Sequence, residues 1–277
     1  IFDNRTGALA VLVAGPAPAA PASLAVLAGG QTAPRIIDLP GPATALTGDG
    51  AGTVYLSTPG GYFVVDLSAG HVARVDIGEA RNVEFTAIAR RGDARMVLGT
   101  ADGTVYTQAY GAATNRTKIS FRVDSLVAQE NTVAVLDREQ TSVTTIGADG
   151  KVGQALRAGQ GATTMTADPL GRVLVADTRG GQLLVFGVDP LILRQAYPVR
   201  QAPYGLAGSA RLTWVSQTAA NSVIGYDLST GIPVEKVRYP TVRQPNLLAL
   251  DDTSDTLYVV SGSGAGVQVI EHAAGPR

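Results

Sequence analysis

The sequence predicts an all-β protein, a seven-bladed β-propeller of four-stranded antiparallel blades. Three observations support this fold class. Short runs of alternating apolar and polar residues recur about every 40 residues, almost no segment has helical periodicity, and glycine or aspartate turns separate the runs. A repeat of this length indicates an array of similar units, and four strands per unit favour the radial arrangement of a propeller.

Each repeat is identified by an apolar run that is followed by glycine or by polar residues. The seven runs begin at residues 8, 53, 94, 132, 172, 212 and 256. A second run follows each of them, as GYFVVDLS (61–68) follows TVYLSTPG (53–60). A strand of small residues such as EFTAIAR (84–90) precedes the run, and a more polar strand such as PVEKVRYP (233–240) ends most repeats. We expect the small-residue strand to lie innermost and the charged strand to face water.

The turn between the third and fourth strands recurs almost unchanged in two repeats. YDLSTG (226–231) closely matches VDLSAG (65–70). Asp and Ser side chains hydrogen-bond to nearby backbone, and glycine supplies a positive φ. The sequence therefore predicts a hairpin turn, and its two copies are four repeat lengths apart.

The repeats predict one domain over residues 1–277. The expected blades cover approximately residues 1–41, 42–79, 80–123, 124–158, 159–200, 201–241 and 242–277. The last blade has only three strands, and IFDNRTG at the start resembles the end of an inner strand. We expect residues upstream of Ile1 to complete the ring, as the outer strand of the last blade. Six blades with an irregular N-terminal hairpin are the alternative.

The composition excludes several classes of function. The net charge of −1 argues against a generic nucleic-acid binder, and no apolar run reaches the length of a membrane span. Without cysteine there are no disulfides, cysteine–zinc sites or thiol nucleophiles. The two histidines, His71 and His272, fall in a turn and in the C-terminal tail. No familiar catalytic or nucleotide-binding motif is present, so we expect no cofactor. We also expect a monomer.

Two segments carry a family resemblance. VADTRGGQLLVFGVD (175–189) and SQTAANSVIGYDLSTG (216–231) resemble the NHL and YVTN-type propellers, and APYGLAG (202–208) looks like their approach to the inner strand. The resemblance implies the fold, whereas these families include scaffolds, ligand binders, sensors and a few enzymes. The Ala-, Gly- and Arg-rich composition with three lysines suggests the mature part of an exported actinobacterial protein, extracytoplasmic and with an upstream lipid anchor as an option.

Four arginines recur with the blades. Arg81, Arg122, Arg200 and Arg243 each lie six or seven residues before the alanine of an inner strand. In a propeller, the loops that lead from outer to inner strands share one face, and guanidinium groups suit carboxylates or phosphates. We therefore expect a protein partner or an anionic small-molecule or envelope ligand at that face. The candidate residues are Arg81, Asn82, Arg122, Asp124, Gln160, Arg200, Gln201, Tyr204, Arg243, Gln244 and Asn246.

Two alternatives stand beside this one. The arginines could instead pair with acids of neighbouring blades: Glu79, Asp124, Asp137 or Asp177. The fold also suits a metal-dependent lactonase or hydrolase of the gluconolactonase type, in which Glu84 and Asp124 would be the carboxylate ligands. We favour a non-enzymatic binding or scaffold domain of the cell envelope, with enzymatic activity left open. Trp214 is expected to pack between blades.

Overall fold

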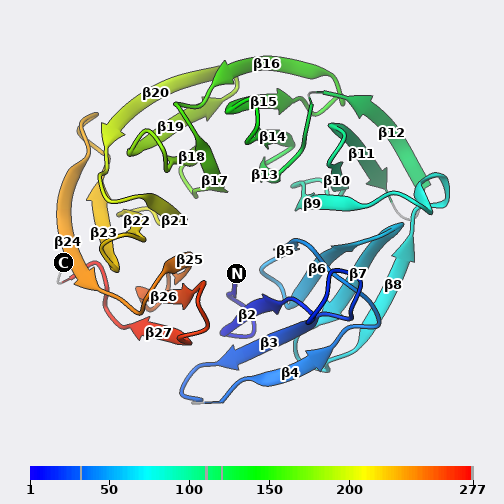
Figure 1. The fold of residues 1–277 in the computed structure, drawn as a ribbon, viewed down its shortest axis with the longest axis horizontal. Coiled ribbons are helices and arrows are strands. Elements are labelled where there is room, and N and C mark those ends of the chain that lie inside the picture. The colour runs from blue at the N-terminus through cyan, green and yellow to red at the C-terminus, as the bar shows by residue number, and fades with distance from the viewer. Residues whose placement is uncertain (32, 110–111, 120, 276–277) are drawn as a thin grey trace. The chain divides into compact units, whose positions relative to one another are not determined.

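The computed structural model describes residues 1–31, 33–109, 112–119 and 121–275, and its fold is a seven-bladed β-propeller (Figure 1). Six antiparallel sheets have four strands and the seventh has three. In every sheet the spatial order follows the chain order. The predicted fold class is confirmed. The six-blade alternative is wrong, because residues 2–38 form a complete four-stranded sheet and not an irregular hairpin.

The chain divides into two compact units, residues 1–135 with 146–152, and residues 136–145 with 153–277. The division within residues 125–157 cuts through one sheet, and the prediction of a single domain stays a prediction. Among the described residues the only helix is the 3-10 turn η1 (Gly78–Ala80), and none is long and apolar enough to cross a bilayer.

The first unit contains three complete sheets. Their strands are β1 (Phe2–Asp3), β2 (Ala8–Val13), β3 (Ser23–Ala28) and β4 (Arg35–Asp38); β5 (Leu46–Gly48), β6 (Thr53–Thr58), β7 (Gly61–Asp66) and β8 (Val72–Asp76); and β9 (Phe85–Arg90), β10 (Met96–Thr100), β11 (Thr104–Ala109) and β12 (Ala112–Lys118). The fourth sheet is shared by the two units: β13 (Ser125–Gln129), β14 (Thr132–Asp137), β15 (Ser142–Ile146) and β16 (Val152–Arg157).

The second unit contains the other three sheets. They are β17 (Ala162–Ala167), β18 (Arg172–Asp177), β19 (Gln182–Val188) and β20 (Leu191–Pro198); β21 (Pro203–Gly208), β22 (Thr213–Gln217), β23 (Ser222–Asp227) and β24 (Val234–Pro240); and β25 (Pro245–Asp251), β26 (Thr256–Ser261) and β27 (Val267–Ile270). The last sheet has three strands, as predicted.

One outer strand departs from the sequence pattern. The sequence pattern predicts the outer strand of this blade at RTKISFRV (116–123), whereas β12 covers Ala112–Lys118 and pairs with β11 from the Ala109–Ala112 pair onward. Ser120 lies outside the described residues. The hairpin register starts immediately after β11, so backbone pairing outweighs the apolar alternation further along. Phe121 consequently lies in a loop and is 71% exposed.

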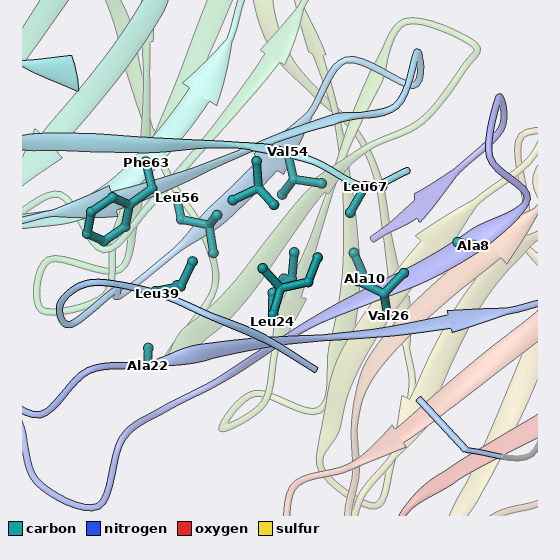
Figure 2. Packing of buried hydrophobic residues seen from close by; sticks show 12 residues of the cluster. Ala8, Ala10, Ala22, Leu24, Val26, Leu39, Val54, Leu56, Phe63 and Leu67 are labelled. Carbon is teal, nitrogen blue, oxygen red and sulfur yellow. The ribbon is translucent and has the colours of Figure 1, made fainter. Parts of the chain in front are cut away.

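Apolar alternation builds the core between neighbouring sheets. In the first unit, Leu24 and Val26 of β3 pack against Val54 and Leu56 of β6 and Phe63 of β7, and all five are buried (Figure 2). Burying such a side chain stabilises a protein by about 1.5–3 kcal/mol. In the second unit Trp214 is fully buried among residues of β25–β27, so the prediction that it packs between blades is confirmed.

Hydroxyl groups tie neighbouring inner strands together. Thr44 Oγ1 donates to the Phe85 carbonyl at 2.5 Å, Thr86 to the Val123 carbonyl, and Thr164 to the Tyr204 carbonyl. Each bond reaches the next inner strand or the loop leading to it. Threonine in the inner strands, or just before them as at Thr44, therefore links one blade to the next.

The recurring turn has the predicted chemistry. Asp227 Oδ1 accepts the Ser229 amide at 2.9 Å, and Asp66 Oδ1 accepts the Ser68 amide at 2.7 Å. Each turn ends in a glycine with φ near +80°. The sequence recurs because these two hairpins require the same short turn.

Candidate functional site

Two loops of the second unit carry similar short sequences. Val199-Arg200-Gln201-Ala202-Pro203 joins β20 to β21, and Val242-Arg243-Gln244-Pro245 joins β24 to β25. We call residues 199–203 and 242–245 the arginine loops. The inner strands that follow them are neighbours, because a Cβ at Gly205 would lie 3.0 Å from the Asn246 carbonyl oxygen.

Both arginine loops are fixed to one turn, residues 218–221, between β22 and β23. The Thr218 amide donates to the Ala202 carbonyl at 3.0 Å, and the Ala219 amide to the Gln201 carbonyl at 3.2 Å. On the other side, the Gln244 amide donates to Asn221 Oδ1 at 2.9 Å. The two loops therefore flank a single turn.

In each of these two blades, the last residue of the second strand hydrogen-bonds to the backbone of the arginine. Gln217, the last residue of β22, donates from Nε2 to the Arg200 carbonyl at 2.7 Å. Ser261, the last residue of β26, donates from Oγ to the Arg243 carbonyl at 2.7 Å. The backbone of each arginine is thus hydrogen-bonded while its side chain is exposed.

The arginine loops store backbone strain. Gln201, Ala202 and Gln244 have φ angles of +67°, +55° and +49°, in the region that L-residues rarely adopt. Such residues persist only when surrounding contacts determine their conformation, and they concentrate at ligand clamps and active sites. The hydrogen bonds described above supply those contacts.

Asp177, the last residue of β18, has the equivalent role in the preceding blade. It is fully buried and accepts the amides of Gln160 at 2.9 Å, Gly161 at 2.8 Å and Gly180 at 2.9 Å. Its carboxylate therefore anchors a loop backbone, and the side chain of Gln160 is exposed on that loop.

The predicted arginines have different surroundings. Arg200, Arg243 and, in the first unit, Arg81 are exposed, and none of them forms an ion pair within the described part of the chain. Arg122 Nε instead lies 2.6 Å from Asp124 Oδ1. That ion pair is the kind the alternative interpretation expects, although the acid belongs to the same loop.

The remaining predicted residues are placed as follows. Tyr204 and Asn246 are half-buried at the starts of β21 and β25. Gln201 and Gln244 are exposed on the arginine loops, and Asn82 is exposed after η1. The second unit therefore brings Arg200, Gln201, Tyr204, Arg243, Gln244 and Asn246 onto two neighbouring loops and strand starts.

No group of three or more His, Asp or Glu side chains that could hold a metal ion occurs among the described residues. Glu84 is exposed, and Asp124 is ion-paired with Arg122. His71 and His272 are both exposed.

Sequence reasoning missed the residues that shape the arginine loops. Gln217, Asn221 and Ser261 are not acidic, basic or aromatic, so nothing in their chemistry marks them. Their signal is positional: Gln217 and Ser261 end the second strand of a blade, as Asp177 does.

No family model matches the chain, and no curated protein is similar to it in sequence. Solved structures are similar in fold. A structure of streptogramin B lyase has a TM-score of 0.71 at 10% identity, over 97% of this chain and 94% of the other. A chain of a mitotic checkpoint complex has a TM-score of 0.77 at 10% identity, over 97% and 84%. These likenesses show the fold alone, and the NHL or YVTN type stays a prediction.

Proposed function

We propose that the protein is a non-enzymatic binding or scaffold propeller, and that its arginine loops bind an anionic group of a ligand or protein partner. The observation that carries the proposal is the pair of exposed arginines, Arg200 and Arg243, on two loops fixed to one turn. A guanidinium group offers several donors in a planar fork that matches carboxylate and phosphate geometry.

Preorganisation strengthens the case. The loop backbones are held by Gln217, Ser261 and Asn221 before any ligand arrives. Binding therefore orders only the arginine side chains, which lowers the entropic cost of association. The exposed amides of Gln201 and Gln244 add neutral donors and acceptors beside the two charges.

The proposed setting is the cell envelope, outside the cytoplasm. It rests on the Lys-poor, Arg-rich composition and on the resemblance to NHL and YVTN-type propellers. In that setting the ligands would be anionic glycans, lipid headgroups or an acidic segment of a protein.

Thermal unfolding with a panel of anionic glycans and lipids tests the proposal. A ligand at 100 times its Kd stabilises the folded state by about 2.7 kcal/mol, which shifts the midpoint measurably. We expect the shift to be lost in the double variant Arg200→Gln/Arg243→Gln and kept in Arg157→Gln, which changes an exposed arginine of β16.

A shift that survives the double variant would refute the site. The same experiment with calcium and other divalent metals tests the lactonase alternative. A metal-dependent shift that is lost in Glu84→Gln would favour the enzyme.

A further inference from the structure

Five short segments of the second unit form a continuous row over three neighbouring sheets. Hydrogen bonds already described join two of them, the arginine loops, to the turn between β22 and β23. At one end of the row, Thr178 Oγ1 in the turn between β18 and β19 donates to the Pro203 carbonyl at 2.6 Å. At the other end, the Gly262 amide in the loop between β26 and β27 donates to the Gln244 carbonyl at 2.8 Å. We call these segments the basic row: residues 178–181, 199–203, 218–221, 242–245 and 261–266.

The basic row carries three positive charges and no negative charge. Its arginines are Arg179, Arg200 and Arg243, and it contains no Asp, Glu or Lys, although the whole chain has a net charge of −1. All three arginines are exposed. The stem of Arg179 lies over the loop before β17, since a Cβ at Gly161 would come within 2.6 Å of the Arg179 Cβ. Positive charge is therefore distributed along the row, and no acid within the row neutralises it.

The three arginines are fixed to successive sheets. Arg179 lies in the turn between β18 and β19, whereas the Arg200 carbonyl is bonded to the end of β22 and the Arg243 carbonyl to the end of β26. Shared apolar cores pack these sheets face to face. Sheets packed in this way lie about 10 Å apart. The backbones of the three arginines are therefore spaced by about 10 Å from one sheet to the next.

Small and neutral polar residues make up the surface between the arginines. The three turns of the row have the sequences Thr-Arg-Gly-Gly, Thr-Ala-Ala-Asn and Ser-Gly-Ser-Gly-Ala-Gly. None of the large exposed apolar side chains among the described residues belongs to the row. The exposed amides of Gln201 and Gln244 stand directly after Arg200 and Arg243. An extended ligand that crosses the row therefore meets hydroxyl and amide groups between the charges.

We propose that the basic row binds a linear acidic polysaccharide, whose carboxylate or sulfate groups pair with successive arginines. This inference rests on the proposed function and names the ligand class of the arginine loops. It also adds Arg179 to the site. The spacing of the sheets favours a polymer with one anionic group about every 10 Å.

The side chains of the row favour a glycan over the other anionic ligands. Protein interfaces centre on buried aromatic or apolar anchors, and helices that lie on lipid surfaces insert apolar side chains. The row offers no exposed side chain of either kind among the described residues. Sugar hydroxyls both donate and accept hydrogen bonds, as the amides and hydroxyls of the row do. Neutral sugars between the acidic ones would therefore also be bound.

Hyaluronan oligosaccharides are the probe, because they carry one carboxylate per disaccharide. In titration calorimetry with the whole chain, the octasaccharide should bind roughly a hundredfold more tightly than the disaccharide, since linked weak contacts act together. Arg179→Gln should weaken octasaccharide binding about tenfold and change disaccharide binding much less. Arg194→Gln removes the same charge from an exposed position of β20 outside the row, and this matched control should bind both oligosaccharides normally.

Three results would overturn the inference, and they separate it from the proposed function. Equal affinities for the disaccharide and the octasaccharide, both lost in Arg200→Gln/Arg243→Gln, would leave an anion site that binds no extended polymer. Tighter binding of a poly-glutamate peptide or of phosphatidylglycerol vesicles, with the same dependence on Arg179, would assign the row to a protein or a membrane. Absence of arginine-dependent binding to all of these probes would refute the proposed function itself.

Discussion

Substitution of Asp177 tests whether the segment VADTRGG (175–181) has a structural role. Asp177→Ala removes the acceptor of three backbone amides, those of Gln160, Gly161 and Gly180. A buried donor left without a partner costs about 1–3 kcal/mol. Because water reaches the loop that carries Gln160, we take the lower end for each amide, about 3 kcal/mol in total. At 2–4 °C per kcal/mol, the midpoint should fall by roughly 6–12 °C.

Thermal and urea unfolding followed by circular dichroism measure this loss. Asp177→Asn keeps one acceptor oxygen and should lose about half as much. Asp227→Ala is the matched control, since that carboxylate lies in an exposed turn and accepts the Ser229 amide. Equal midpoints for Asp177→Ala and Asp227→Ala would refute the assignment of Asp177 as a buried anchor.

Three further predictions concern the core. Trp214→Ala should cost about 3–5 kcal/mol in urea unfolding because the ring is fully buried; a loss below 1 kcal/mol would contradict the packing. Gly99→Ala should cost about 1–3 kcal/mol, since its methyl group would overlap Val123, whereas Gly78→Ala meets open space and should be near neutral. Burial raises the pKa of Tyr226 from 10.0 to about 12. The contribution of Tyr226 to the free energy of unfolding is full below pH 10 and is lost as the pH rises toward 12. Tyr226→Phe should therefore flatten the alkaline decline in the free energy of unfolding.

Much of the fold could be predicted because each blade repeats strands in which apolar and polar residues alternate with a period of two. The runs that begin at residues 53, 132, 172 and 256 are strands that start at those residues. Buried strand faces require apolar residues at alternate positions, so the pattern survives without any long-range information. The bounds of the outer strand β12 could not be predicted, because outer strands face water and their register comes from the preceding hairpin.

The loops of the candidate site could be predicted from spacing, but their anchors could not. The last residue of the second strand is Asp177 in one blade, Gln217 in the next and Ser261 in the last. All three hydrogen-bond to the loop before their own inner strand, one by accepting amides and two by donating to a carbonyl. Three residue types with one role leave no recognisable motif, because the requirement is a polar group at that position and not a particular side chain.

Three of the ion-paired arginines share one local sequence pattern. Arg74 pairs with Asp76, Arg91 with Asp93 and Arg122 with Asp124, each two residues further along. The residues two positions after Arg81, Arg200 and Arg243 are Val83, Ala202 and Pro245. These three arginines therefore lack the acid that Arg74, Arg91 and Arg122 each have two positions further along.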